Sequence, residues 1–278
     1  MSHEKKELLL GKHTHYVSEY DASLIFPIAR DENREKLNQP VIKVNGSLPF
    51  FGFDVWTGYE VSWLNLKGKP QVAIAQFIIP AQSSHIVESK SFKLYLNSFN
   101  QTRLDHRQDV EKRLQQDLSA GFGAQVQVQL HGVMGFPINH QNLGVNIDYL
   151  DVEVNEYSPN AQILSLDEQQ VSETVHSNLL KSNCPVTSQP DWATLVIQYK
   201  GVRLNHEALL KYIISYRGHD DFHEHCVEQI FCDLLNLGGF EELTVSARYT
   251  RRGGLDINPT RSLLPIDQET LIGRLDRQ

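Results

Sequence analysis

The stretch FGFDVWTGYEVSWLNL at positions 51–66 alternates apolar with polar residues, and QVAIAQFII at positions 71–79 does the same. The four residues between them, KGKP, are typical of a turn. Two alternating stretches joined by a short turn predict a long β-hairpin. The apolar residues at positions 87–100 and 109–118 have helical spacing, and positions 125–130 alternate again.

The same order of elements recurs in the second half of the chain, at an offset of about 117 residues. VEKRLQQDL in the first half aligns with VEQIFCDL in the second, which is a weak similarity in the correct order. Five matched elements in sequence predict a tandem repeat. The second copy is expected to consist of strands at 173–181 and 192–200, helices at 205–217 and 223–235, and a strand at 242–250.

A ββααββ unit of this kind belongs to the α+β class, with helices on one face of an antiparallel sheet. Two such sheets have open edges, so we expect barrel closure on oligomerisation and at least a homodimer. The expected domains are an N-terminal arm (1–45), a first repeat (46–150), an acidic linker (151–173) and a second repeat (174–278). The tail beyond Pro259 is expected to be irregular or a short helix.

The net charge of −8 and a pI near 5.8 argue against binding to nucleic acid, which normally requires a basic face. No apolar run is long enough for a signal peptide or a membrane span. The cysteines number three and have no close pair spacing, which suits a reducing compartment. The expected location is the cytoplasm.

The second hairpin turn, SNCPVTSQPDW, contains a cysteine and an aspartate that the first turn lacks. Pro185 and Pro190 restrict the backbone around Cys184, and Asp191 follows where the next strand begins. A thiol and a carboxyl that converge across one turn can act as nucleophile and proton donor. The alternative is that Cys184 is only a packing residue, but a polar, proline-rich turn is a poor place for one.

The other two cysteines lie in a predicted helix. Cys226 belongs to its apolar stripe and is expected in the core, whereas Cys232 lies off the stripe and is interpreted as a spectator.

His223 and Glu224 are expected in the first turn of the same helix, where a titratable imidazole and amide donors can reach a ligand. Asp221 and Glu224 also have the spacing of a capping box, and both interpretations can hold. A zinc site is the minor interpretation, because two of its histidines would point to different helix faces. Its ligands would come from His219, His223, His225 and Cys226.

The first-copy helix begins with Glu88-Ser89-Lys90-Ser91, which alone indicates an ordinary charged first turn. Arg251 and Arg252 precede Gly253 and Gly254, a tight-turn pattern in which the arginines could hold a phosphate. No GxGxxG motif follows a strand, so a Rossmann nucleotide site is not indicated.

Taken together, SNCPVTSQPDWA, ESKSFKLYLNSFN, DFHEHCVEQIF and RRGGLDINP resemble the NADPH-dependent 7-cyano-7-deazaguanine reductases, the nitrile reductases of queuosine biosynthesis, in their long two-repeat form. The resemblance spans nearly the whole chain and implies the tunnelling fold. It implies 7-cyano-7-deazaguanine as substrate, NADPH as cofactor and a covalent thioimide on Cys184, with Asp191 and His223 as proton donors. By motif position it implies a substrate site of Val87, Glu88, Ser89, His223 and Glu224, and an NADPH site of Ser89, Lys90, Arg252 and Gly253.

Two alternatives remain open at this point. One is a zinc-dependent cyclohydrolase on the same fold, with Cys184 and the histidines as ligands. The other is a purine-binding protein without catalytic activity.

Overall fold

The computed structural model describes residues 17–37, 43–138, 143–268 and 273–278. The predicted first-half elements are confirmed, because apolar alternation and helical spacing match the faces that become buried. They are the hairpin β2 (Phe51–Leu64) and β3 (Pro70–Pro80), the helices α2 (Ser89–Asn97) and α3 (Arg107–Phe122), and the strand β5 (Gln127–His131).

The second half contains the predicted elements in the same order. They are β7 (Leu166–Asn183), β8 (Pro190–Leu204), α4 (His206–Ser215), α5 (His223–Leu237) and β9 (Phe240–Tyr249). Strand β7 starts at Leu166, so its hairpin reaches into the segment that the sequence analysis treated as a linker.

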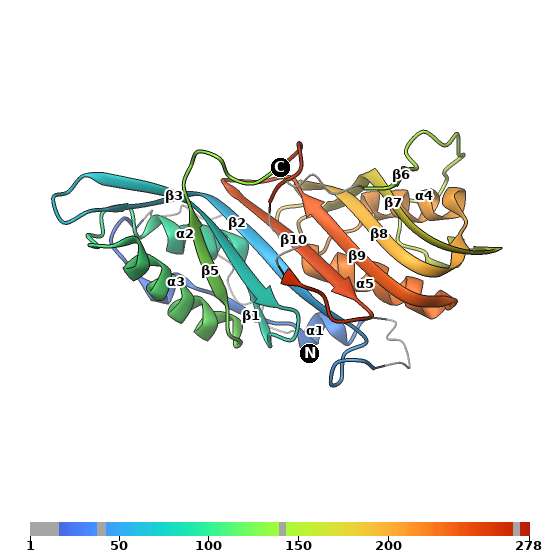
Figure 1. Ribbon diagram of the computed structural model, residues 1–278, viewed down its shortest axis with the longest axis horizontal. Coiled ribbons are helices and arrows are strands. Elements are labelled where there is room, and N and C mark those ends of the chain that lie inside the picture. The colour runs from blue at the N-terminus through green and yellow to red at the C-terminus, as the bar shows by residue number, and fades with distance from the viewer. Residues whose placement is uncertain (1–16, 38–42, 139–142, 269–272) are drawn as a thin grey trace.

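One eight-stranded sheet runs through both halves, in the order β5-β3-β2-β10-β9-β8-β7-β6 (Figure 1). All pairings are antiparallel except that of the short β6 (Val145–Asn146) with β7. The halves join where β10 (Leu255–Ser262) pairs with β2 over eight residues. The chain is therefore α+β, with its two halves joined through a shared sheet.

Strand β10 corrects the expectation of an irregular tail beyond Pro259. Its many polar residues hide the alternation of apolar and polar side chains that marks a strand. Pro259 also argues against a strand, because proline cannot donate a backbone hydrogen bond to the sheet and is rare inside one. Its pairing with β9 begins only at Thr260. Before that point the Asn258 side chain bridges the two strands by accepting a hydrogen bond from the Tyr249 amide at 3.1 Å.

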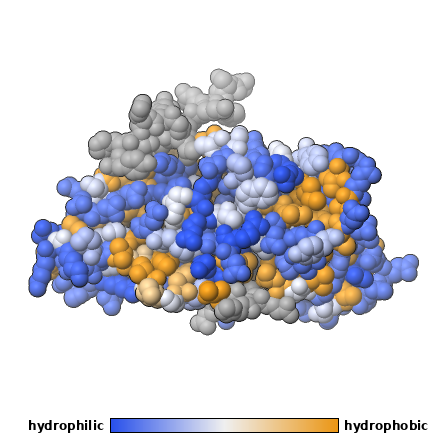
Figure 2. Space-filling view, turned by 90° about the horizontal axis from the view of Figure 1, so that it is seen from above, coloured by the Kyte–Doolittle hydropathy of each residue, from blue (hydrophilic) through white to orange (hydrophobic). Residues whose placement is uncertain are grey.

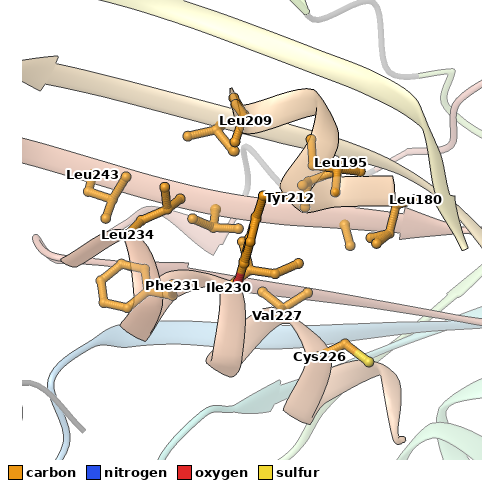
Figure 3. Packing of buried hydrophobic residues seen from close by; sticks show 14 of the residues in the cluster. Leu180, Leu195, Leu209, Tyr212, Cys226, Val227, Ile230, Phe231, Leu234 and Leu243 are labelled. Atoms are coloured by element: carbon orange, nitrogen blue, oxygen red, sulfur yellow. The ribbon is translucent and has the colours of Figure 1, made fainter. Parts of the chain in front are cut away.

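Both apolar cores lie on the same face of this sheet. Trp56 of the first core pairs with Ile257, and Val245 of the second pairs with Arg261, four residues further along β10. Side chains four apart on a strand share a face. Helices α2 and α3 cover the first core, while α4 and α5 cover the second, where Tyr212, Phe231 and their neighbours interdigitate (Figure 3).

The N-terminal segment packs against the first half. Strand β1 (Pro27–Ala29) pairs with β4 (His85–Val87), and η1 (Ala22–Leu24) contacts α2. The charged DENREK run forms α1 (Asp31–Arg34). Two further short helices, η2 (Ala161–Ile163) and η3 (Tyr216–Gly218), complete the structure.

A buried ion cluster, here called the junction cluster, joins the N-terminal segment to both halves. The Asp54 carboxylate receives Arg261 Nη1 at 2.7 Å, and Glu228 receives Arg34 Nη2 at 2.7 Å and Arg261 Nη2 at 2.8 Å. Arg30 Nη2 lies 2.5 Å from Asp54. The cluster consists of Arg30, Arg34, Asp54, Glu228 and Arg261, all buried.

In the described part of the chain, no helix is both long and apolar enough to cross a membrane. Seen from above, the surface is largely hydrophilic, with separate apolar patches between the hydrophilic areas (Figure 2).

Candidate active site

A pocket that is partly open to solvent lies where the two halves meet, and its empty space, with the open part included, is about 610 Å³. Its wall combines the β4–α2 boundary, the β7–β8 turn, the start of α5 and the beginning of β10. Residues far apart in the sequence therefore face one space. The predicted site residues on this wall are Val87, Glu88, Ser89, Cys184, Asp191, His223, Glu224 and Arg252. Of the remaining predicted residues, Lys90 and Gly253 lie outside this wall.

Cys184 lies in the β7–β8 turn with 9% of its surface exposed. Its amide donates to the Gln189 carbonyl at 2.9 Å, and its carbonyl accepts from the Ser188 amide at 2.9 Å, so the turn is closed by its own backbone. Burial raises the pKa of the thiol, but hydrogen bonds from the Thr187 side chain, two backbone amides and Arg252 outweigh it, and the pKa falls below the ordinary value. A lowered pKa favours the nucleophilic thiolate.

Asp191 opens β8 and is buried, with 5% exposed. His223 Nε2 lies 3.2 Å from one carboxylate oxygen, and Arg252 Nε lies 3.3 Å from the other. The His223 ring also stacks on Tyr249, with centroids 3.7 Å apart and planes at 2°. Its Nδ1 is buried and has no partner within the described residues. The imidazole is held in a fixed orientation while one nitrogen stays available.

The two predicted recognition glutamates differ in their contacts. Glu88 is the N-cap of α2, and its carboxylate accepts from the Lys90 amide at 2.9 Å and the Ser91 amide at 2.6 Å. Glu224 is equally buried, but its Oε1 has no partner within the described residues. Burial and the nearby Asp54 raise the pKa of Glu224, against the lowering effect of Arg30 and His223.

The predicted capping box at the start of α5 is wrong. Phe222 is the N-cap and makes no side-chain cap bond. Asp221 instead accepts from the Phe222 amide at 2.8 Å and binds His219 and His225. Those contacts lower the pKa of Asp221 despite its burial.

The histidines are therefore divided between two carboxylates, since His219 and His225 bind Asp221 while His223 binds Asp191. Within residues 17–37, 43–138, 143–268 and 273–278, no group of three or more histidine, cysteine or acidic side chains is arranged to hold a metal ion. Cys226 is fully buried in the second core, as expected. Cys232 is also fully buried in that core, so the expectation that it lies off the apolar stripe is wrong.

Cationic side chains gather beside the cavity. Lys93 of α2 lies on the wall, and burial followed by the charges of Arg252 and Lys90 lowers its pKa. Gly253 has a φ of +60°, and a Cβ there would meet the Lys93 side chain at 3.3 Å. This turn therefore brings Arg252 close to Lys93, whose charge also interacts with that of Lys90 on the same helix.

Sequence reasoning missed several residues around the cavity. Thr187 was quoted only as part of a turn, although its hydroxyl bonds the Cys184 thiol. Lys93 follows Lys90 at helical spacing, a signal that could have found it. Trp56 and Arg30 gave no signal, because only the folded sheet brings them near.

Two family profiles match the chain. The N-terminal profile of the nitrile reductase, 7-cyano-7-deazaguanine reductase, matches residues 16–130, and the profile described as QueF-like protein matches residues 190–264.

Curated relatives carry one name, NADPH-dependent 7-cyano-7-deazaguanine reductase. The relative from Bordetella avium is 55% identical, over 91% of this chain and 92% of its own length. The relative from Coxiella burnetii (strain CbuK_Q154) is 52% identical, over 95% of this chain and 93% of its own. The relative from Cupriavidus necator is 52% identical, over 91% of this chain and 92% of its own length. This chain belongs to the family of the NADPH-dependent 7-cyano-7-deazaguanine reductases.

Proposed function

We propose that this chain reduces the nitrile of 7-cyano-7-deazaguanine to the primary amine of 7-aminomethyl-7-deazaguanine, with NADPH as reductant, in queuosine biosynthesis. The names of its relatives support the reaction. The single observation that supports the mechanism best is one cavity that contains the Cys184 thiol, the Asp191 carboxyl and Glu224.

In the first step Cys184 adds to the nitrile carbon. The thiol loses its proton to Asp191, the sulfur forms a bond to carbon, and Asp191 returns the proton to the nitrile nitrogen. The product is a covalent thioimide. The contacts of Asp191 with His223 and Arg252 fix the position of its carboxylate. The lowered pKa of Cys184 favours the thiolate form of its side chain.

When bound, NADPH would supply the hydride for each of the two reductions, first at the thioimide carbon and then at the imine carbon. After the first hydride, loss of the Cys184 thiolate breaks the carbon–sulfur bond and leaves the imine bound. In this proposal His223 donates a proton to nitrogen in the second reduction, and its contacts with Asp191 and Tyr249, which fix the ring, support that role.

The substrate ring is recognised by carboxylates. The unpartnered Oε1 of Glu224 can accept from the guanine-like N–H and amino edge, and a buried charge-assisted pair of this kind discriminates against rings that lack the edge. Val87, Glu88, Ser89 and His223 complete the substrate site in this proposal.

The chain's own donors fit NADPH. Arg252 and Gly253 form a turn beside Lys93, and Lys90 lies near Lys93 on the same helix. Such cations beside a partly apolar cavity suit a phosphate-bearing cofactor. Ser89 lines the same cavity and belongs to both sites in this proposal. The assembly proposed for this enzyme is a cytoplasmic homodimer of tandem tunnelling-fold repeats, whose open sheet edges close a barrel.

The test measures how many NADPH molecules are consumed for each nitrile that is reduced. Purified chain, 7-cyano-7-deazaguanine and NADPH are expected to form the aminomethyl product with consumption of two NADPH per nitrile. Asp191→Asn is expected to slow turnover at least about a hundredfold, in line with the loss of a general acid–base group. Nitrile-independent oxidation of NADPH, or turnover by the variant at the parent rate, would contradict the proposal.

A further inference from the structure

A second, smaller cavity of about 230 Å³ lies next to the candidate active site. The two cavities share Ile86, Phe222 and Glu224 on their walls. Arg30 lies on the far wall, together with Glu228 and His225. Glu224 therefore borders the active site and also a cavity that contains an N-terminal arginine.

Arg30 is held rigidly. Its Nε donates to Ser83 Oγ at 3.0 Å, its Nη2 lies 2.5 Å from Asp54, and its Nη1 lies 3.8 Å from Glu228. Its side chain is only 3% exposed. A buried guanidinium fixed in this way keeps its charge and its position.

Arg30 is the guanidinium of the junction cluster that lines the same small cavity as Glu224. An opposite charge nearby favours the ionised form of a carboxyl, so the Arg30 charge favours ionised Glu224.

The N-terminal segment that contains Arg30 also holds the Val87–Glu88 side of the proposed substrate site. Strand β1 pairs with β4, so Pro27 is opposite Val87, and the Glu88 amide donates to the Phe26 carbonyl at 2.9 Å. The N-terminal segment thus bonds the backbone of Glu88 directly, and its Arg30 lines the same small cavity as Glu224.

We infer that Arg30 is a positioning residue of the substrate site, which keeps Glu224 ionised so that its carboxylate can accept hydrogen bonds from the purine-like edge. The inference rests on the proposed role of Glu224 in substrate binding. Several other charged or titratable groups line the two cavities or lie in the junction cluster. They are Arg34, Asp54, Glu88, Lys93, Cys184, Asp191, Asp221, His223, His225, Glu228, Arg252 and Arg261.

The sign of the effect follows from these charges. Arg30 lowers the pKa of Glu224, and Asp54 raises it. Loss of the Arg30 charge makes Glu224 accept a proton at higher pH, and loss of the Asp54 charge does the reverse. An opposite charge nearby typically shifts a carboxyl by about one pH unit or more.

The experiment measures 7-cyano-7-deazaguanine binding by calorimetry without NADPH, between about pH 5.5 and about pH 8.5. The parent is Cys184→Ala, which removes the covalent step and the thiol titration. In Arg30→Gln the acid limb of binding is expected to move up by about one pH unit, so that affinity falls about tenfold at the acid end and recovers at the alkaline end. Arg30→Lys, which keeps the charge, is expected to restore most of the parent profile.

Arg34→Gln is the matched control, because Arg34 belongs to the same cluster but binds Glu228 and the Ala81 carbonyl. Its acid limb is expected to coincide with that of the parent. Asp54→Asn is expected to move the acid limb of binding to lower pH. This variant tests the inference if Arg30→Gln does not fold. The inference is overturned if Arg30→Gln loses affinity equally at every pH, or if Asp54→Asn moves the limb up or not at all. A parent that binds no ligand at any pH would overturn the proposed function itself.

Discussion

Glu228 at the centre of the junction cluster should contribute strongly to stability. Burial raises its pKa, but Arg261, Arg34 and Arg30 outweigh burial and bring it from an ordinary 4.5 to about 2. One pKa unit corresponds to about 1.4 kcal/mol, so the ionised carboxylate contributes roughly 3 kcal/mol to the free energy of unfolding. Because the folded-state pKa is depressed, this contribution is complete above about pH 4.5 and is lost as the pH falls towards about 2.

Glu228→Gln should therefore lower the free energy of unfolding at neutral pH by roughly 3 kcal/mol, or the melting temperature by about 5 to 10 °C. Urea unfolding followed by circular dichroism measures the difference, and repeating it below about pH 4 should show the two proteins converging. Glu241→Gln is the control, because Glu241 pairs with Lys200 on the exposed surface and should leave stability unchanged. A Glu228→Gln protein as stable as the parent at neutral pH would refute the reasoning.

Three further predictions concern the site. Thr187→Ala removes a hydrogen bond that lowers the Cys184 pKa, so the pH at which iodoacetamide labels this thiol should rise; an unchanged inflection would show that the backbone amides and Arg252 suffice. Gly253→Ala places a Cβ at positive φ against Lys93, and should raise the KM for NADPH several-fold while calorimetric binding of the nitrile stays constant; equal losses in both would argue against a cofactor role. Tyr249→Leu removes the ring stacked on His223 and should reduce kcat about tenfold, with Tyr249→Phe retaining most activity; a Phe variant as slow as the Leu variant would assign the effect to the hydroxyl instead.

Much of the fold could be predicted because its signals are local. The hairpins, the four main helices and the strands β5 and β9 follow from period-two and helical spacing, which needs no tertiary information. Strand β10 could not be predicted, since its polar residues are buried by neighbours in the folded sheet and Pro259 indicates an irregular segment. The join between halves depends on β10 and was missed with it.

The site could be predicted in part for the same reason. Cys184 and Asp191 stand close together in one turn, so their convergence is visible in the sequence. Arg34 is 194 residues away from Glu228, and its segment was interpreted only as an N-terminal arm. The capping box failed because Asp221 has two histidine partners, one of them within a turn of helix. Local spacing cannot rank such competing partners.

The central claim is that Cys184 forms a covalent bond to the nitrile carbon. The most direct measurement is the intact mass of the protein after incubation with 7-cyano-7-deazaguanine in the absence of NADPH, beside a Cys184→Ala control. The parent is expected to gain the mass of the ligand, the control to gain none, and the adduct to disappear when NADPH is added. Turnover without any adduct, or an adduct that persists in Cys184→Ala, would contradict it.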